Sequence, residues 1–470
     1  MKSDNALFDD DLEFDIDDDM DVALSSVFED APEPPVNAGF EAEDADLALD
    51  LDLDLDLDAP MKPIEPIADL STQGGERAIP AISIGAFCET GRTAQLVASV
   101  SRDRRMSQAS LDLHEGGLEA AIAYLSENPT PNLLILESTE NNGTMLAQID
   151  ELAGHCDEGV QVMVIGAVND ISLYRQLMAR GVSEYLVPPI TPVQVIRSIS
   201  NLFSDPDAPF VGKSISVIGA KGGVGASTIA HNLAWSMSEN VRVNTALVDL
   251  DLSFGTTSLD FNQESQQTVA DALLAPERVD DAVITRLLSK ATDKLSLFTA
   301  PASVGQVIDV HTEAYQIVID GVRRVMPYVV LDLPHGWNRW QYNTLVSSDE
   351  VILVCQPDLA SLRNGKNILD KLKADRPNDA APRVILNMMG VPKRPEIPAK
   401  DFAGAMGVEP EVIIPFDPQL FGTASNNGQM ISETDATAAP AVEIDRLASF
   451  VTGQTVAVER KSLLKKLLGK

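Results

Sequence analysis

Cysteine is scarce in this sequence, and long apolar runs are missing. The chain has 470 residues but only three cysteines, Cys88, Cys156 and Cys355, which are far apart and form no CxxC pair. This spacing gives no disulfide framework and argues against a zinc site. No apolar run approaches the roughly 20 residues that a membrane-spanning helix needs. The N-terminus is acidic and does not have the form of a secretory signal, so we expect a cytoplasmic protein.

Basic residues are scarce as well, and their scarcity is uneven. Residues 1–60 contain 22 acidic residues and a single base, Lys2, whereas the rest of the chain contains 49 acidic and 34 basic residues. The remainder is therefore only mildly acidic. Because no long basic patch is present, we expect no binding to nucleic acid.

The acid-rich start of the chain predicts a disordered tail over residues 1–78. It contains the acidic run DDDLEFDIDDDMD, a proline-rich segment, and the alternation LALDLDLDLDLD at Leu47–Asp58. Alternation suits a half-buried strand, but aspartates side by side on a sheet would repel one another. We therefore favour a solvated tail. The alternative is a tail whose leucines dock on a basic partner.

Short apolar runs alternate with helical stretches over residues 79–205, which predicts a small α/β domain. The expected strands are Ala81–Ala86, Pro131–Glu137, Val160–Ile165 and Ser183–Val187, and helices are expected over Gly117–Leu125 and Ile171–Arg180. This alternation implies a parallel sheet with helices on both faces. A linker over residues 206–213 and a larger α/β domain over residues 214–455 are expected to follow.

A glycine-rich stretch carries the strongest chemical signal. The apolar run Ser214–Gly219 predicts a strand, Ile229–Met237 has helical spacing, and AKGGVGAST lies between them. Strand, glycine-rich turn and helix in this order predict a phosphate-binding loop, because glycines let backbone N–H groups turn toward phosphate oxygens and the helix start adds partial positive charge. The predicted binding residues are Gly222, Gly223, Val224, Gly225, Ala226, Ser227 and Thr228, with Ser227 also a ligand of Mg²⁺. The alternative is an ordinary glycine-rich turn.

The spacing KGGxGx[ST]T resembles the deviant Walker A loop of ParA/MinD-type ATPases. The resemblance implies ATP and Mg²⁺ as ligands, and it implies that Lys221 reaches across a dimer to the nucleotide of the partner. The usual P-loop lysine would stand at position 226, where this sequence has Ala226. That lysine normally lies on the β- and γ-phosphates. We therefore expect nucleotide binding to persist and hydrolysis to be weak or absent.

Two acidic strand ends agree with this resemblance. Thr245–Gly255 (TALVDLDLSFG) predicts a strand that ends in Asp249 and Asp251. The family implies that Asp251 positions the attacking water and that Asp249 supports it. Val325–Trp337 (VMPYVVLDLPHGW) predicts a buried strand closed by Asp332, which the resemblance makes a Walker B aspartate that holds Mg²⁺ through water. The alternative is that these are ordinary loop aspartates.

Two later strands are expected over Val351–Val354 and Val384–Asn387. The resemblance implies that Asn387, at the end of the second strand, reads the edge of the adenine. It also implies that Pro415 and Phe416, in the segment IPFDP, lie over the base. An asparagine at a strand end is often only a turn former, and this alternative remains open.

The domain over residues 79–205 resembles a response-regulator receiver domain, on the segments PNLLILE and GVSEYLVPPITPVQV. The position of the phospho-accepting aspartate holds Glu137, and Pro188 stands where the receiver has a lysine. The acidic pair of the receiver falls near Phe87 and Cys88, with Glu89 adjacent. Because most of the phosphoryl-transfer set is missing, we expect a pseudo-receiver used for docking or dimerisation. A phospho-regulated signalling protein is the disfavoured alternative.

A receiver-like domain followed by a deviant ATPase resembles the CpaE/TadZ proteins of Flp/Tad pilus assembly, over residues 80–450. The tract FDPQLFGTASNNGQMISE adds to the likeness. The expected fold class is α/β, with a disordered acidic tail, a receiver-like parallel sheet and a doubly wound P-loop NTPase sheet. The resemblance implies a nucleotide-dependent homodimer that acts at the cell pole with pilus secretion proteins or a polar landmark protein. The alternative is an active ParA- or MinD-like ATPase that positions DNA, flagella or the division site.

The last residues, VERKSLLKKLLGK at Val458–Lys470, predict a short basic amphipathic helix. On a helical wheel Leu463, Leu464, Leu467 and Leu468 lie on one arc, with Lys465 and Lys466 outside it. Such a segment can lie in a membrane interface, so residues 456–470 are expected to contact the inner membrane peripherally. The alternative is a closing helix whose leucines pack on protein.

Overall fold

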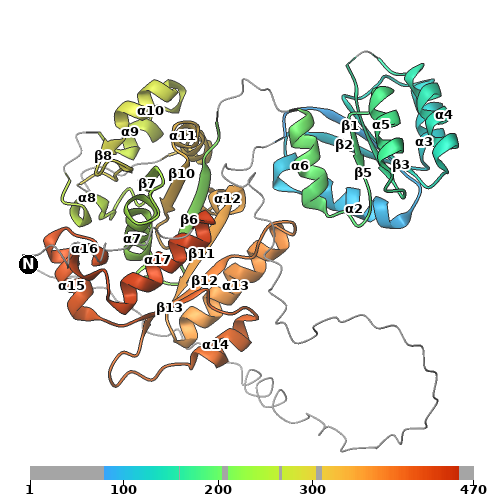
Figure 1. Ribbon diagram of the computed structural model, residues 1–470. Helices are drawn as coiled ribbons and strands as arrows, with labels where there is room; N and C mark the ends of the chain where they lie inside the picture. The colour runs from blue at the N-terminus through green and yellow to red at the C-terminus, as the bar shows by residue number, and fades with distance from the viewer. Residues whose placement is uncertain (1–78, 158, 204–209, 264–266, 303–309, 455–470) are drawn as a thin grey trace, which may run out of the picture. The chain divides into compact units, whose positions relative to one another are not determined.

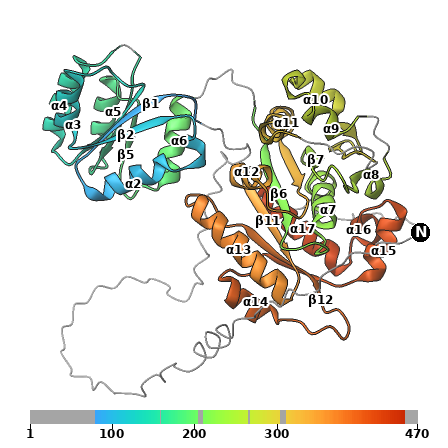
Figure 2. The ribbon, with the colours of Figure 1, turned by 180° about the vertical axis from the view of Figure 1, so that it is seen from behind.

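The computed structural model describes residues 79–157, 159–203, 210–263, 267–302 and 310–454. These residues form two sheets, each with its own helices (Figures 1 and 2). The predicted acidic tail over residues 1–78, the predicted C-terminal segment over residues 456–470 and part of the predicted linker, residues 206–209, lie outside the described residues. The predicted domain boundaries at 79–205 and 214–455 stay a prediction.

The first sheet has five strands, all parallel, in the order β2-β1-β3-β4-β5. The strands are β1 (Ser83–Cys88), β2 (Ser110–Glu115), β3 (Leu133–Ser138), β4 (Gln161–Gly166) and β5 (Glu184–Leu186). The helices are α2 (Gly91–Ser101), α3 (Leu118–Leu125), α4 (Asn142–Ala153), α5 (Ile171–Ala179) and α6 (Pro192–Leu202), with a 3₁₀ turn η3 (Arg104–Met106). A helix joins each strand to the next, as parallel neighbours require.

Helices cover both faces of this sheet. On one face Val97 of α2 and Ile196 of α6 pack with Ile135 of β3. On the other face Leu134 and Leu136 of β3 pack with α3, α4 and α5. Successive side chains of a strand point to opposite faces, so a strand covered on both sides must be apolar throughout. This explains why PNLLILE was recognisable as a strand from the sequence.

The second sheet has eight strands in the order β13-β12-β11-β6-β10-β7-β9-β8. The strands are β6 (Lys213–Gly219), β7 (Thr245–Asp249), β8 (Ser289–Lys290), β9 (Leu295–Phe298), β10 (Tyr328–Asp332), β11 (Glu350–Cys355), β12 (Arg383–Met389) and β13 (Val412–Pro415). All neighbouring pairs are parallel except β8 and β9, which are antiparallel at the edge. The predicted α/β class with a doubly wound parallel sheet is therefore confirmed, with the short strand β8 as an addition.

The helices of the second sheet are divided between its two faces. The elements are α7 (Ala226–Glu239), α8 (Thr257–Asp260), α9 (Val269–Leu273), η4 (Pro276–Arg278), α10 (Asp281–Leu287), α11 (Thr312–Val325), α12 (Arg339–Ser347), α13 (Leu359–Asp375), α14 (Ala399–Met406), α15 (Pro418–Asn427), α16 (Ile431–Asp435) and α17 (Ala439–Thr452). Side chains of α7, α15, α16 and α17 share one core, and those of α9 to α14 share the other.

The order of the strands determines where a ligand can bind. The chain leaves β6 for β7 on one side and later crosses to β11, β12 and β13 on the other side (Figure 1). In open α/β sheets, ligands bind outside the carboxyl ends of the strands at the point where the strand order reverses. Here that point is the carboxyl end of β6, where the glycine-rich loop leads into α7.

Candidate functional site

The glycine-rich loop, residues 220–225, joins the end of β6 to the first residue of α7. Gly223 and Gly225 have positive φ angles of 78° and 86°, in the left-handed region that favours glycine. A Cβ atom on Gly225 would also lie 2.7 Å from Nδ2 of Asn387. The predicted turn between strand and helix is therefore present, and position 225 has no room for a side chain.

Two side-chain amides hold carbonyl groups of this loop. Gln356, just after β11, donates from Nε2 to the carbonyl oxygen of Gly223 at 3.0 Å. Asn387, on β12, donates from Nδ2 to the carbonyl oxygen of Val224 at 2.9 Å. Both side chains belong to buried residues. Because these carbonyls are engaged with the protein, the loop N–H groups remain the polar groups available to an anion.

Gln356 was not predicted as a site residue, although its place in the sequence could have suggested it. It is an uncharged amide at the end of an apolar strand, in a position similar to that of Asn387 on the neighbouring strand. Asn387 was predicted to read the adenine edge, and that role stays a prediction. One N–H of its Nδ2 is engaged by Val224, which leaves its Oδ1 and the second N–H for a contact with a base.

The other two predicted base contacts lie at the end of β13. Pro415 is the last residue of that strand, and Phe416 follows it. The backbone N–H of Phe416 donates to the carbonyl oxygen of Met389 at 2.7 Å, which ties this segment to the end of β12. Pro415 and Phe416 therefore lie at the end of the strand next to the one that carries Asn387, and their contact with a base stays a prediction.

Lys221, the first residue of the predicted motif, pairs with an acid of its own chain. Its Nζ lies 2.8 Å from Oδ2 of Asp358, and both side chains are about one-third exposed. Asp358 also caps α13 by accepting from Ser361 N. Burial raises the pKa of Asp358, but the hydrogen bonds from Lys221 and Ser361 outweigh it and hold this pKa below its usual value. In the single chain, Lys221 is thus held in cis.

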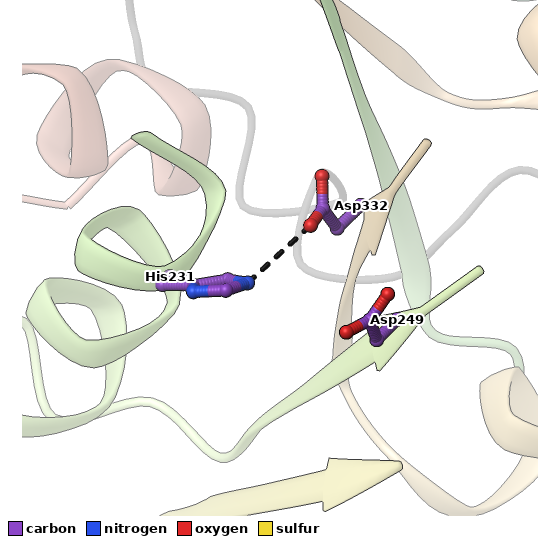
Figure 3. Close-up of side chains that lie close together, drawn as sticks. All are labelled: His231, Asp249 and Asp332. Carbon is purple, nitrogen blue, oxygen red and sulfur yellow. Dashed lines mark ion pairs between the residues drawn. The ribbon is translucent and has the colours of Figure 1, made fainter. Parts of the chain in front are cut away.

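Ser227 and Asp332 meet at the start of α7. Ser227 Oγ donates to Oδ1 of Asp332 at 3.2 Å, and Asp332 lies opposite Asp249 in the register of β10 and β7. Asp249 and Asp332 are buried, and Figure 3 shows them on two neighbouring strands. Hydroxyl and carboxylate oxygens are the ligands that Mg²⁺ prefers. The two predicted ligands, Ser227 and Asp332, therefore lie together with oxygen donors that suit Mg²⁺, and Asp249 lies beside them; that they hold the metal stays a prediction.

The two aspartates after β7 differ in their surroundings. Asp249 accepts from the backbone N–H groups of Asp251 at 3.1 Å and Thr257 at 3.2 Å. Burial, and then the charge of Asp332, raise the pKa of Asp249 to about 6. Asp251 instead caps its own loop, accepting from Phe254 N at 2.9 Å. The role of Asp251 in positioning water stays a prediction.

A buried histidine, His231, lies beside Asp249 and Asp332, and it was not predicted from the sequence. His231 lies one helical turn after Ser227 on α7 and therefore on the same face of the helix. Its Nδ1 is 2.8 Å from Asp260, and its Nε2 is 3.0 Å from Thr257 Oγ1. Its Nε2 is also 3.3 Å from Asp332, and Figure 3 shows this contact. Ligand atoms of His231, Asp249 and Asp332 all lie within 4.8 Å of one another.

The site of the first sheet that corresponds to a receiver's phosphorylation site is filled by protein contacts. Glu137, at the end of β3, accepts from Thr90 N at 2.8 Å, Thr90 Oγ1 at 2.7 Å and Thr93 Oγ1 at 2.6 Å. Glu89 accepts from the backbone and hydroxyl of Thr139. Both oxygens of Glu137 are thus engaged with the N-terminal turn of α2. The carboxylate therefore connects β3 to α2.

Replacing Glu137 with alanine should destabilise the first domain by about 2 kcal/mol, because the buried hydroxyl of Thr93 and the partly buried donors of Thr90 lose a charged acceptor. Urea unfolding followed by hydrogen exchange on peptides from β1 and β3 measures the effect. Glu140→Ala, at an exposed acid three residues away, is the matched control and should change little. A Glu137→Ala variant as stable as the parent would contradict the tie between β3 and α2.

Comparisons with known proteins bear on both parts of the chain. A family profile described as an AAA domain matches residues 212–377. The septum site-determining protein MinD of Synechocystis is 24% identical over 254 residues, which cover 52% of this chain and 90% of that protein.

Two solved structures are also similar to this chain. The crystal structure of the pilus assembly protein CpaE from Caulobacter crescentus is 47% identical over 27% of this chain and 98% of that chain, with a TM-score of 0.27. The septum site-determining protein MinD complexed with Mg-ADP from Pyrococcus horikoshii is 22% identical over 51% of this chain and 96% of that chain, with a TM-score of 0.46.

The class of the second part follows from its architecture. A doubly wound sheet whose first strand runs through a glycine-rich loop into a helix is the fold of a P-loop NTPase of the ParA/MinD type. Since 98% of the solved Caulobacter chain is matched at 47% identity, the chain belongs to the family of CpaE-type pilus assembly proteins. The resemblance expected from the sequence is thereby confirmed.

Among the described residues, each helix is too short or too polar to span a bilayer. The basic C-terminal segment predicted to contact the membrane lies outside this part of the chain.

Proposed function

We propose that this chain binds ATP with Mg²⁺ at the glycine-rich loop and acts as a dimerising localisation and assembly factor for Flp/Tad pili at the cell pole, with weak or absent hydrolysis. The observation that carries the proposal is the loop between β6 and α7. Two of its carbonyls accept from Gln356 and Asn387, while position 226 has no cation. Such a site can bind phosphates through backbone N–H groups, but it does little to stabilise the charge that develops in phosphoryl transfer.

Each residue has a distinct part in this proposal. Ser227 and Asp332 hold Mg²⁺, supported by their 3.2 Å contact and their oxygen donors. The residues of the loop from Gly222 to Thr228 bind the phosphates. Asp251 positions water for whatever slow hydrolysis occurs, and Lys221 acts on the nucleotide of the partner. Mg²⁺ supplies charge neutralisation at the phosphates.

Calorimetric titration of the full chain with ATP tests this assignment. We expect binding of ATP that strengthens when Mg²⁺ is present and weakens when Asp332 is replaced with asparagine. Absence of ATP binding, or binding that ignores both Mg²⁺ and Asp332, would contradict the nucleotide site.

The alternative function is an active ATPase of the ParA or MinD kind that positions DNA, flagella or the division site. The acidic pair Asp249 and Asp332 and the lysine Lys221 would be compatible with it. Ala226 and the receiver-like sheet favour the first proposal. Turnover of ATP, measured beside its binding, separates the two.

Dimerisation is proposed to occur through the end of the second sheet where the strands have their carboxyl ends and where the glycine-rich loop lies. Three large apolar side chains that follow the carboxyl ends of β7, β10 and β11 are exposed: Phe254 after β7 (75%), Trp337 after β10 (48%) and Leu359 after β11 (73%). Single exposed apolar residues are common, but three at one edge of one sheet favour an interface. A second copy that brings its own Lys221 to this edge would cover them.

Lys221→Ala should weaken ATP-dependent dimers, and Asp358→Asn should strengthen them. The first change removes the lysine proposed to act in trans, and the second removes its partner in cis. The asparagine still caps α13. Exposed ion pairs are worth about 0.2–1 kcal/mol each and a dimer contains two of these pairs, so Asp358→Asn should tighten the dimer by roughly two- to thirty-fold. Sedimentation with and without ATP measures this, and the same oligomer in all samples would refute the role of Lys221.

Action at the pole is proposed to involve pilus secretion proteins or a polar landmark protein. The basic segment over residues 456–470 would add reversible contact with an anionic membrane, and dimerisation would double that contact. Deleting residues 459–470 should then abolish ATP-dependent pelleting with anionic vesicles. If the full and truncated chains pelleted equally, the segment would have no membrane role.

A further inference from the structure

Gln356 lies beside the glycine-rich loop because of the strand that precedes it. That strand, β11, is the parallel neighbour of β6, and Val354 near its end is opposite Gly219 at the end of β6. The backbone N–H of Ala220, the first residue of the loop, donates to the carbonyl oxygen of Val354 at 2.9 Å. The apolar strand ends at Cys355. Gln356 is therefore the first residue after the strand, and its polar side chain reaches the loop.

Both hydrogens of the Gln356 amide have an acceptor. Nε2 donates to the carbonyl oxygen of Gly223 at 3.0 Å and lies 2.9 Å from Sδ of Met388. A carbonyl oxygen and a thioether only accept hydrogen bonds, so the nitrogen of this amide, and not its oxygen, faces the loop. Gln356 is only 7% exposed, so its amide has little freedom to turn. It is therefore a fixed donor to the loop before any ligand arrives.

Met388 supports this arrangement from β12. Its φ angle is 56°, which is uncommon for a residue with a side chain. The pairing of β12 with β13 shifts register between Leu386 and Met389, at the same place. The Met388 side chain contacts Gln356 through its sulfur, and its Cε would lie 3.5 Å from a Cβ atom on Gly225. Unusual backbone conformations of this kind cluster at binding sites.

The turn between β11 and α13 holds the loop at a second point. Asp358 in this turn caps α13 and pairs with Lys221, two residues before Gly223. The turn is itself held by hydrogen bonds. The N–H of Gln356 donates to Ser361 Oγ at 3.2 Å, and the N–H of Asp358 donates to the carbonyl oxygen of Gln356 at 2.8 Å. One short segment thus fixes both the side chain of Lys221 and the carbonyl of Gly223.

We propose that Gln356 is a positioning residue for phosphate binding: its amide holds the carbonyl of Gly223 away from the anion, and so sets the N–H groups of the loop for phosphate oxygens before the ligand arrives. This rests on the proposed nucleotide site. A loop whose shape is set in advance loses less freedom when a ligand binds, and the affinity rises accordingly.

The missing cation at position 226 makes this contribution larger. Since alanine stands there, binding of phosphate depends more on the backbone N–H groups, and hence on the shape of the loop, than it would beside a lysine. The effect of Gln356 concerns the phosphates and not the base. It should therefore extend to any ligand with linked phosphates, including inorganic tripolyphosphate.

Calorimetric titration of the full chain with ATP, and separately with inorganic tripolyphosphate, tests the proposal in the presence of Mg²⁺. Gln356→Met keeps the length of the side chain but removes the donor. It should weaken the binding of both ligands by about ten-fold, because a buried carbonyl loses its partner and the loop loses its fixed shape. An equal loss for the two ligands separates a role at the phosphates from a role at the base.

Two further variants separate donation from the general effect of substitution. Gln356→Leu also lacks a donor but has a different shape, and it should lose as much affinity as Gln356→Met. Gln316→Met, at a glutamine of α11 whose Nε2 donates to Asp320 at 3.0 Å, is the matched control and should bind both ligands as the parent does. All three should unfold within about 4 °C of the parent, since one hydrogen bond contributes little to the whole fold.

Three results would overturn the proposal. The first is a Gln356→Met variant that binds both ligands as the parent does, which would leave Gln356 a purely structural role. The second is a loss for ATP without a loss for tripolyphosphate, which would place Gln356 on the side of the base. The third is a parent that binds ATP but no tripolyphosphate. Binding of neither ligand by the parent would contradict the nucleotide site itself, and this proposal with it.

Discussion

Valine at position 225 is expected to lower the affinity of the chain for ATP at least about 100-fold, a loss of about 2.7 kcal/mol. Gly225 has a φ of 86°, which a β-branched residue avoids, and a Cβ atom there would lie 2.7 Å from Asn387 Nδ2. The side chain would displace the amide that holds Val224, and the loop N–H groups would turn away from the phosphates. Calorimetric titration with ATP and Mg²⁺ measures the change.

Gly404→Val provides the control for this substitution. Gly404 lies within α14, and a Cβ atom there would meet nothing within 4 Å. The control should keep the parent's affinity for ATP, so that a loss at position 225 reflects the loop and not the general effect of valine. Parent-like binding by Gly225→Val would show that this loop does not bind the phosphates.

Lysine at position 226 is expected to raise ATP turnover by about 10²–10³-fold. Loss of one preorganised group that stabilises transition-state charge commonly lowers a rate by about that factor, and Ala226 is the position where the resemblance places the missing cation. Ala226 is the first residue of α7 and is only partly buried, so a longer side chain can be accommodated. Release of phosphate under saturating ATP and Mg²⁺ measures the effect.

Ala226→Met is the matched control, because methionine is long but uncharged. It should leave turnover at the parent's level, while Ala226→Lys raises it. Equal turnover in the two variants would mean that charge at position 226 does not limit hydrolysis. The cause would then have to be sought elsewhere, for example in the cis pairing of Lys221 with Asp358.

Much of the fold could be predicted from the sequence because the parallel strands are covered on both faces. Strands β3, β4, β6, β10 and β11 are nearly continuous apolar runs, and each was recognisable as such. β2 was missed, since it is an edge strand whose side chains in SLDLHE are exposed or only partly buried. An edge strand of this kind is held by its backbone pairing, which leaves little trace in hydropathy.

The site was only partly predictable for a similar reason. Gly225, Ser227 and Asp332 are recognisable because their motifs are local in the sequence. His231 and Gln356 could not be identified in this way, because the residues that they contact are distant in the sequence. His231 contacts Asp332, and Gln356 contacts Gly223. The ion pair between Lys221 and Asp358 of the same chain joins residues far apart in the sequence, and no local sequence pattern predicts it.

The most direct test of the proposed function is to measure ATP binding and ATP turnover on the same preparation of the full chain with Mg²⁺. We predict saturable ATP binding together with turnover that is far below the usual enzymatic range of about 1–10³ s⁻¹. Saturable binding with turnover inside that range would contradict the central claim, and the active ATPase would then be the better description.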